Sequence, residues 1–220
     1  RHLATRAETG GLLRVSLPAG LQQMFFAAGL VAMFWIIGKI GTPELAAANV
    51  LITVLLFAIL PGLALGIACT TLVGQALGQA NPDDANQWTW DVSKVTIILR
   101  TVLGLPMWLV PDLVSSIFIH EPSTRDLARW PMRVMGLTMP LEAISFAFMH
   151  GLLGAGDARR VMQVSIGTQW LLFLPTAYLL GPVMGFGLLA VWLIQGGSRA
   201  LQAFLFVTMW RGRKWQHIEV

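Results

Sequence analysis

One carboxylate stands out chemically because it lies in the middle of an apolar stretch. Glu142 is the only Asp, Glu, Lys or Arg between Val134 and Gly156, a run of 23 residues. If this run crosses a bilayer, Glu142 lies near mid-depth, where an ionised side chain costs about 2.5 to 3.5 kcal/mol on insertion scales. A bundle-facing carboxyl group can bind and release a proton, or exchange it for Na⁺, as a cavity opens to each side in turn. Alternatively, an Arg or polar neighbours hold Glu142 for packing alone.

Other residues that could act with Glu142 follow it on the same predicted helix. Ser145, Phe146 and Met149 share its face because they come three, four and seven residues later. His150 lies about 80° around the helix and is a candidate for proton transfer. An aromatic ring and a flexible thioether beside a carboxylate suit a binding wall that accepts varied compounds, although the same spacing is typical of packing.

A second charge within an apolar run is Arg199. It could pair with Glu142, or its long side chain could extend to the aqueous edge, and we favour the second interpretation. Arg100 lies nearer its helix end and is expected to extend in the same way. Uncharged polar residues within the runs need hydrogen-bond partners, either between helices or as cavity lining. These residues are Gln22, Gln23, Asn49 and Gln169.

The composition indicates a membrane protein. The chain is 55% hydrophobic and 12% charged, whereas a soluble domain carries about 25% charged residues because its surface must be solvated. The net charge of +4 comes from basic residues spread over several loops, so we expect no nucleic-acid partner. Cys69 is the single cysteine, and the four His residues are scattered without a metal-binding spacing. We therefore expect no enzyme and no resident cofactor or metal.

Apolar runs separated by glycine, proline and charged residues predict an all-α integral membrane protein with a bundle of six transmembrane helices. The predicted helices are about Val15–Gly38, Leu45–Leu72, Ser93–Val110, Trp130–Leu153, Val161–Leu180 and Leu188–Trp210. This lobe, residues 15–210, lies between a connector, 1–14, and a tail, 211–220. Nine Lys and Arg residues on the side of the termini, against four on the other side, place both ends in the cytoplasm. The chain begins with Arg rather than Met, and we expect it to be a piece of a longer protein.

Short motifs along nearly the whole chain resemble the C-terminal six-helix lobe of the multidrug and toxic compound extrusion (MATE) transporters. The blocks Leu72-Val73-Gly74-Gln75 and Gly154-Ala155-Gly156-Asp157 are fairly specific at this separation. Further matching segments are Leu17-Pro18-Ala19-Gly20, Gly41-Thr42-Pro43-Glu44-Leu45, Pro61-Gly62-Leu63-Ala64-Leu65-Gly66, Pro140-Leu141-Glu142 and Gly185-Phe186-Gly187. Counted back from the second block, Glu142 falls where this lobe of the family usually carries an acid.

The resemblance implies a multi-pass antiporter of the bacterial inner membrane, built from two six-helix lobes. Such a protein exports organic cations or other small amphipathic compounds in exchange for H⁺ or Na⁺, and its partners would be the lipid bilayer and a missing N-terminal lobe. Many relatives have a further acid in the first helix of this lobe, where this chain reads Phe25, Phe26 and Ala27. Coupling would then rest on Glu142 and on acids in the other lobe, and the choice between H⁺ and Na⁺ stays open.

Three other functions compete with drug antiport. A lipid-linked oligosaccharide flippase of the same superfamily would need a strongly basic cavity, and only Arg100 and Arg199 hint at one. A membrane enzyme would need a catalytic set at membrane depth, which Glu142 and His150 alone do not supply. A non-transporting membrane scaffold would give a mid-bilayer acid no reason to persist.

Overall fold

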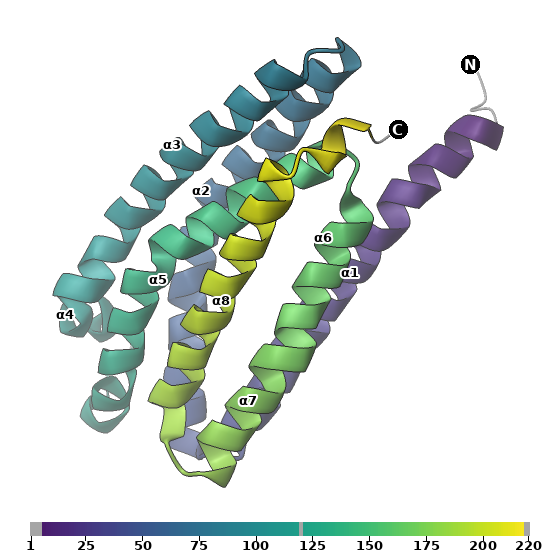
Figure 1. Ribbon diagram of the computed structural model, residues 1–220. Coiled ribbons are helices and arrows are strands. Elements are labelled where there is room, and N and C mark those ends of the chain that lie inside the picture. The colour runs from purple at the N-terminus through teal and green to yellow at the C-terminus, as the bar shows by residue number, and fades with distance from the viewer. Residues whose placement is uncertain (1–5, 119–120, 218–220) are drawn as a thin grey trace.

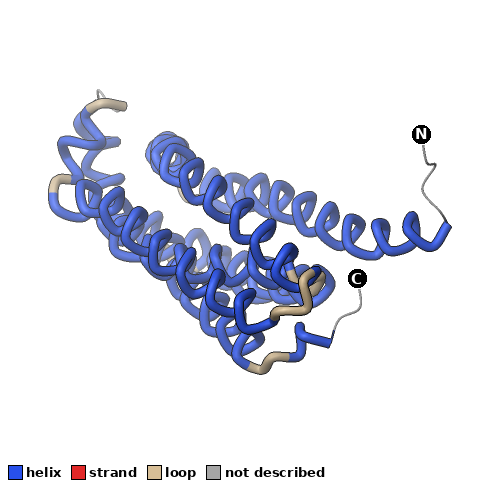
Figure 2. The backbone as a smooth tube through the Cα atoms, turned by 90° about the horizontal axis from the view of Figure 1, so that it is seen from above, coloured by secondary structure: helices blue, strands red, loops and turns tan. Residues whose placement is uncertain are grey.

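The computed structural model describes residues 6–118 and 121–217, and within them every regular element is a helix (Figure 1). Short loops join the helices (Figure 2). The elements are α1 (Arg6–Gly38), α2 (Thr42–Gly78), α3 (Pro82–Leu109), α4 (Pro111–Ser116), α5 (Pro122–Gly154), α6 (Ala158–Ile166), η1 (Gly167–Phe173), α7 (Leu174–Tyr178), η2 (Leu179–Val183), α8 (Gly187–Arg211) and η3 (Lys214–His217).

Six spans in this part of the chain are long and apolar enough to cross a membrane, which confirms the predicted six-helix bundle. The fifth span, 158–183, is composite, because α6 and α7 alternate with the π-helical segments η1 and η2 in one continuous rod (Figure 1). The sequence analysis predicted a regular helix here. Single π-turns within helices occur frequently at functional sites. The segment η1 contributes Thr168, Gln169 and Phe173 to the lining of a cavity.

Several helices extend beyond the predicted apolar runs. α3 begins at Pro82 instead of Ser93, because a proline stands in its first turn and the Asn81 side chain accepts a hydrogen bond from the Asp84 backbone N–H at 3.2 Å. α1 begins at Arg6, so residues 6–14 of the predicted connector are helical, while residues 1–5 lie outside the described part. Apolar length thus predicts the membrane-crossing part of a helix, whereas caps determine where the helix itself begins.

α5 lies at the centre of the bundle, in contact with α2, α3 and α8. α1 packs mainly against α6, and the two form a separate pair beside the other helices (Figure 1). The first turn of α1 and the last turn of α8 lie at the same end of the bundle, as an even number of crossings requires (Figure 1).

The apolar core consists of two clusters, one toward each end of the bundle. The first includes Ile37, Leu51, Met132 and Trp192, and it lies toward the turn between α1 and α2. The second includes Val73, Leu152, Phe206 and Trp210, and it lies toward the chain ends. Each long helix of the central group, α2, α3, α5 and α8, contributes to both clusters. The segments between the clusters therefore form a middle layer, which we call the polar layer because it contains Arg100, Glu142 and Arg199.

Glycines bring the central helices into backbone contact. A Cβ atom on Gly104 of α3 would lie 2.7 Å from the Gly136 carbonyl oxygen of α5, and one on Gly136 would lie 2.6 Å from the Gly104 oxygen. A Cβ on Gly154 would likewise lie 2.6 Å from the Thr70 oxygen of α2. Small residues permit such approach in membranes, where apolar surface gains little by leaving lipid.

The segment Gly62-x-x-x-Gly66 has the small-residue spacing typical of close helix packing in membranes, but it has a different role in the structure. Gly62 makes room for the Arg100 guanidinium, and Gly66 makes room for the rings of Phe146 and His150. These glycines therefore accommodate polar and aromatic side chains at the α2 surface rather than a neighbouring backbone.

Candidate functional site

The polar layer contains a buried ion pair between α3 and α5. Arg100 Nη1 donates to Glu142 Oε2 at 3.2 Å, with 2% of the Arg100 side chain and 13% of the Glu142 side chain exposed. The prediction that Arg100 extends to the aqueous edge is therefore wrong. Desolvation of a guanidinium at this depth is tolerable because a carboxylate lies beside it, and arginines within membranes characteristically pair in this way.

The remaining surroundings of Arg100 are only partly polar. Its Nε and Nη2 atoms are buried without a hydrogen-bond partner in the described part of the chain. Both atoms face Gly62, where a Cβ would lie 2.9 and 2.8 Å away, respectively. The Phe146 ring centroid lies 5.2 Å from Cζ, within the range of a cation–π contact. Glu142 is therefore the principal counter-charge of Arg100.

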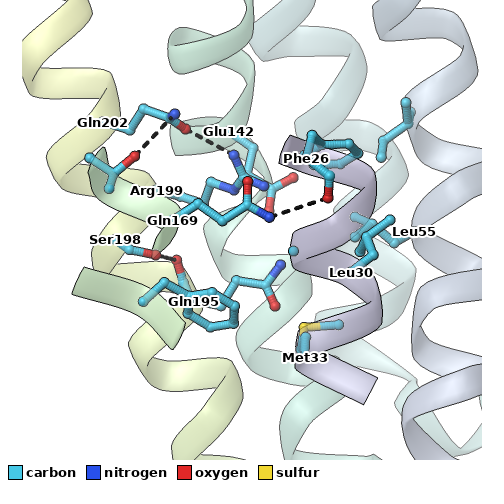
Figure 3. Close-up of a pocket in the computed structure, with 14 residues that line it drawn as sticks. Phe26, Leu30, Met33, Leu55, Glu142, Gln169, Gln195, Ser198, Arg199 and Gln202 are labelled. Carbon is cyan, nitrogen blue, oxygen red and sulfur yellow. Dashed lines mark hydrogen bonds between the residues drawn. The ribbon is translucent and has the colours of Figure 1, made fainter. Parts of the chain in front are cut away.

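Glu142 also lines a cavity of about 70 Å³ (Figure 3). The cavity lies between α1, α2, α5, η1 and α8. Its lining combines apolar side chains from α1 and α2 with polar side chains from η1 and α8. The lining residues are Phe26, Gly29, Leu30, Met33, Leu55, Ile59, Glu142, Thr168, Gln169, Phe173, Gln195, Ser198, Arg199 and Gln202.

α8 supplies a polar stripe to this cavity. Gln195, Ser198, Arg199 and Gln202 are spaced by three, one and three residues, so they share one helical face. Sequence reasoning identified only Arg199 of these four. The spacing was a usable signal, because polar residues at i, i+3, i+4 and i+7 in an otherwise apolar helix indicate a face turned away from lipid.

Hydrogen bonds connect this stripe to α5 and η1. Arg199 Nη1 donates to Gln202 Oε1 at 2.8 Å, and Ser145 Oγ donates to the same oxygen at 3.3 Å. Gln202 Nε2 in turn donates to Thr168 Oγ1 at 3.3 Å (Figure 3). Arg199 thus lies at the cavity, as one of its expected lining residues, and it is not within ion-pair distance of Glu142.

Side chains of η1 bind the backbone of α1 across the cavity. Gln169 Nε2 donates to the Phe26 carbonyl at 3.4 Å, and Trp170 Nε1 donates to the Phe25 carbonyl at 3.2 Å. Gly29 leaves room for the Gln169 amide, which a Cβ at that position would overlap. The polar residue Gln169 therefore both lines the cavity and holds α1 in place.

Gln22 and His150, also selected from the sequence, contact polar groups of neighbouring helices outside the cavity lining. Gln22 donates to Met149 Sδ at 3.3 Å and to Ser165 Oγ at 3.2 Å, away from the cavity lining. His150 lies 3.1 Å from Thr70 Oγ1 through Nδ1 and against Phe146, with ring centroids 4.6 Å apart.

Two candidates lie on the outer surface of the bundle. Gln23 and Asn49 are exposed and are not among the residues that line the cavity. Polarity alone does not distinguish these exposed residues from Gln22 and Gln169, which make hydrogen bonds between helices. The position of each residue around its helix is needed to distinguish them.

Six helices that are long and apolar enough to cross a membrane, with an ion pair and a partly polar cavity between two apolar clusters, define a multi-pass membrane protein. The model of the MatE family matches residues 18–179, and the chain belongs to this family.

Relatives and solved structures agree with this assignment. The chain is 22% identical over 205 residues to the "Probable multidrug resistance protein NorM" of Thermotoga maritima, covering 93% of this chain and 44% of the relative. It is 25% identical to the protein of the same name from Brucella suis, covering 91% and 44%. An outward-facing MATE family multidrug resistance transporter shares the fold with a TM-score of 0.90 at 17% identity, covering 99% of this chain and 49% of that structure. The chain thus spans about half the length of the proteins it matches.

Proposed function

We propose that this chain works as one lobe of an antiporter that exports amphipathic or cationic compounds in exchange for H⁺ or Na⁺. The observation that carries this proposal is the position of Glu142, which pairs with Arg100 on one side and faces a cavity on the other. The relatives named as probable multidrug resistance proteins support the class of substrate. Their greater length supports a second lobe as the partner.

Glu142 would act as the ion-coupling residue because one carboxylate cannot bind a coupling ion and a cationic group of the substrate at the same time. A proton or Na⁺ on Glu142 weakens its attraction for a cationic group in the cavity, and a bound cationic group opposes protonation. Arg100 keeps the carboxylate from being an isolated charge when neither ligand is present. Mutual exclusion of ion and substrate at one carboxylate is the requirement for exchange.

The placement in the membrane follows from the distribution of Lys and Arg. We infer a bacterial inner-membrane protein with both ends in the cytoplasm, because basic residues are more numerous at the end of the bundle that carries the termini. No cofactor is needed for this function besides the coupling ion.

The lipid-linked oligosaccharide flippase is the weaker alternative. Its acidic headgroup calls for a strongly basic cavity, whereas the cavity lining contains one acid, Glu142, and one base, Arg199. One charge of each sign does not make the strongly basic cavity that such a headgroup requires. A non-transporting scaffold would account for neither the cavity nor the carboxylate that faces it.

The test is dye export by the two-lobe transporter that contains this chain, reconstituted in vesicles with an imposed H⁺ or Na⁺ gradient. We expect Glu142→Gln to abolish gradient-driven export, because the amide cannot bind and release a proton. Glu121→Gln is the matched control, since Glu121 is an exposed acid at the start of the same helix. Unchanged export by Glu142→Gln at normal expression would contradict the proposal. The 220-residue chain alone is expected to give no transport.

A further inference from the structure

A groove of about 400 Å³ lies on the surface of α3 and α5 and shares no residue with the cavity that Glu142 lines. We call it the Arg133 groove, after the one charged residue in its lining. Its large apolar side chains are exposed, except for the half-buried Val134. The lining residues are Trp108, Leu109, Trp130, Arg133, Val134 and Leu137.

The Arg133 groove lies toward the end of the bundle that is opposite to the termini. α3 ends at Leu109, and α4 and the first turns of α5 follow at that end (Figure 1). Trp108 and Trp130 are exposed at this level, and neither indole N–H has a hydrogen-bond partner in the described part of the chain. Such rings are enriched where acyl chains meet headgroups, because one part of the indole is apolar and the N–H is polar. The groove is therefore placed where a lipid headgroup would lie.

Arg133 supplies a cation to this apolar surface. The residue is half-buried, and its Cζ atom lies 5.0 Å from the centroid of the Trp130 ring, within the range of a cation–π contact. Its Nε atom is buried without a hydrogen-bond partner, and among the described residues Arg133 makes no ion pair. A guanidinium held in this way offers its terminal N–H groups in one plane, which matches the oxygens of a phosphate.

The acids at this end of the bundle do not neutralise Arg133. Asp112 pairs with Arg129, one turn before Arg133 on α5, at 3.2 Å. Asp126 and Glu121 come seven and twelve residues before Arg133, which is at least about 10 Å along the helix axis. Two arginines one turn apart therefore differ in one respect: the protein itself supplies a counter-charge to Arg129 but not to Arg133.

We propose that the Arg133 groove binds an anionic phospholipid. The phosphate lies on the Arg133 guanidinium, and an acyl chain lies along Leu109, Val134 and Leu137. The lining has the same amphipathic pattern as this occupant, with a cation beside an apolar wall. A net anionic lipid is favoured over a zwitterionic one, because the phosphate of the latter is already compensated by its own cationic group. The inference goes beyond the proposed function, since it concerns the outer surface and does not depend on Glu142.

The bound lipid would join two helices that already touch. The groove draws its lining from both α3 and α5, and a Cβ atom on Gly136, between Val134 and Leu137, would lie 2.9 Å from the Trp108 backbone nitrogen. A lipid that contacts both helices binds only when they are packed together. It therefore stabilises the folded lobe, by an amount that grows with lipid concentration relative to its Kd.

The test measures lipid binding to the two-lobe transporter that contains this chain. Native mass spectrometry from detergent gives the affinity for added phosphatidylglycerol and phosphatidylcholine, which have the same acyl chains and differ in headgroup charge. We expect the wild-type protein to bind phosphatidylglycerol more tightly. Added phosphatidylglycerol should also raise the temperature of thermal unfolding more than phosphatidylcholine does. Equal affinities for the two lipids would overturn the inference.

Variants of two neighbouring arginines assign this preference to the groove. Arg133→Gln should weaken phosphatidylglycerol binding by about tenfold, the loss of one charge-assisted hydrogen bond, with a smaller effect on phosphatidylcholine. Arg129→Gln is the matched control, because Arg129 lies on the same helix one turn away but outside the groove and already paired. An equal loss in both variants would show a general attraction of basic residues for anionic lipid, and the inference would fail.

The remaining outcomes also decide the matter. Unchanged phosphatidylglycerol affinity in Arg133→Gln would mean that another partner, such as the second lobe, covers the groove, and would refute the lipid site. If Arg133→Gln does not fold, Arg133→Lys and Arg129→Lys replace the two variants, since only the first of them loses a planar contact with phosphate. These measurements need no ion gradient, so a failure of the proposed antiport function would leave their result intact.

Discussion

The two sides of the polar layer are held together by different means. On one side, α3 and α5 touch through their backbones, since a Cβ on either Gly104 or Gly136 would collide with the carbonyl oxygen of the other. On the other side, η1 reaches α1 through the side chains of Gln169 and Trp170, with the cavity beside them. Glu142 lies between the two, paired with α3 and facing α1.

The difference indicates which side can move. Backbones in contact cannot shift along each other without breaking a fixed fit, whereas a side-chain amide can exchange one carbonyl for the next by a change of rotamer. The ion pair thus belongs to a rigid half and the cavity lining to an adjustable half. In the proposed antiporter, the rigid half would hold the carboxylate in place while the adjustable half changed the access to it.

The largest effect is expected from disrupting the rigid side. Gly136→Leu would force a side chain into the α3 backbone, where no flexible group can yield, and we expect the bundle not to fold. The measurement is the yield of monodisperse protein in detergent. Gly167→Leu is the matched control, since a Cβ at Gly167 meets nothing within 4 Å. A well-folded Gly136→Leu protein would show that the backbone contact is not needed.

The next largest effect is expected from the ion pair. Arg100→Met leaves Glu142 buried without its counter-charge and should lower the free energy of unfolding by about 3 to 5 kcal/mol. Adding Glu142→Gln to Arg100→Met should restore most of that loss, because no charge then remains unpaired. Unfolding of both variants in mixed micelles, with each single variant as reference, measures the coupling between the residues. Additive losses would mean that the pair contributes little.

A smaller effect is expected on the adjustable side. Gln169→Leu removes the bond to the Phe26 carbonyl and should cost about 0.6 kcal/mol, the average for hydrogen bonds between membrane helices. Gln23→Leu serves as control, because Gln23 is exposed on the bundle surface. The same unfolding assay applies. A loss as large as that of Arg100→Met would show that the two sides are equally rigid.

The smallest effect is expected at Gly29, and it sharpens the comparison most directly. Gly29→Ala displaces the flexible end of Gln169, whereas Gly104→Ala meets a backbone oxygen. Alanine also gains about 1 kcal/mol of helix propensity over glycine, so Gly29→Ala should be close to neutral. Thermal unfolding should therefore show a clear loss of stability for Gly104→Ala and almost none for Gly29→Ala. Equal losses for the two variants would contradict the difference between the rigid and the adjustable side.

The fold could be predicted from the sequence to a greater extent than the site. Uninterrupted apolar runs determine the number of crossings, because backbone in lipid must be helical. Residue type also identified Glu142 and Arg199 as unusual. The partner of Glu142 could not be inferred, since Arg100 comes from another helix and its burial depends on the space left at Gly62. The π-helical form of η1 had no sequence signal that we recognised.

The polar layer lies between two apolar clusters in series, and this arrangement provides electrical insulation. In the proposed antiporter, an ion that reached Glu142 from one end of the bundle would still have a cluster of packed apolar side chains ahead of it. Ion leakage would require water to enter both apolar clusters at the same moment. If the two clusters open independently, the probability of this event is the product of two small probabilities. Under the proposed function, a lobe built in this way would open at either end and still dissipate little of the ion gradient.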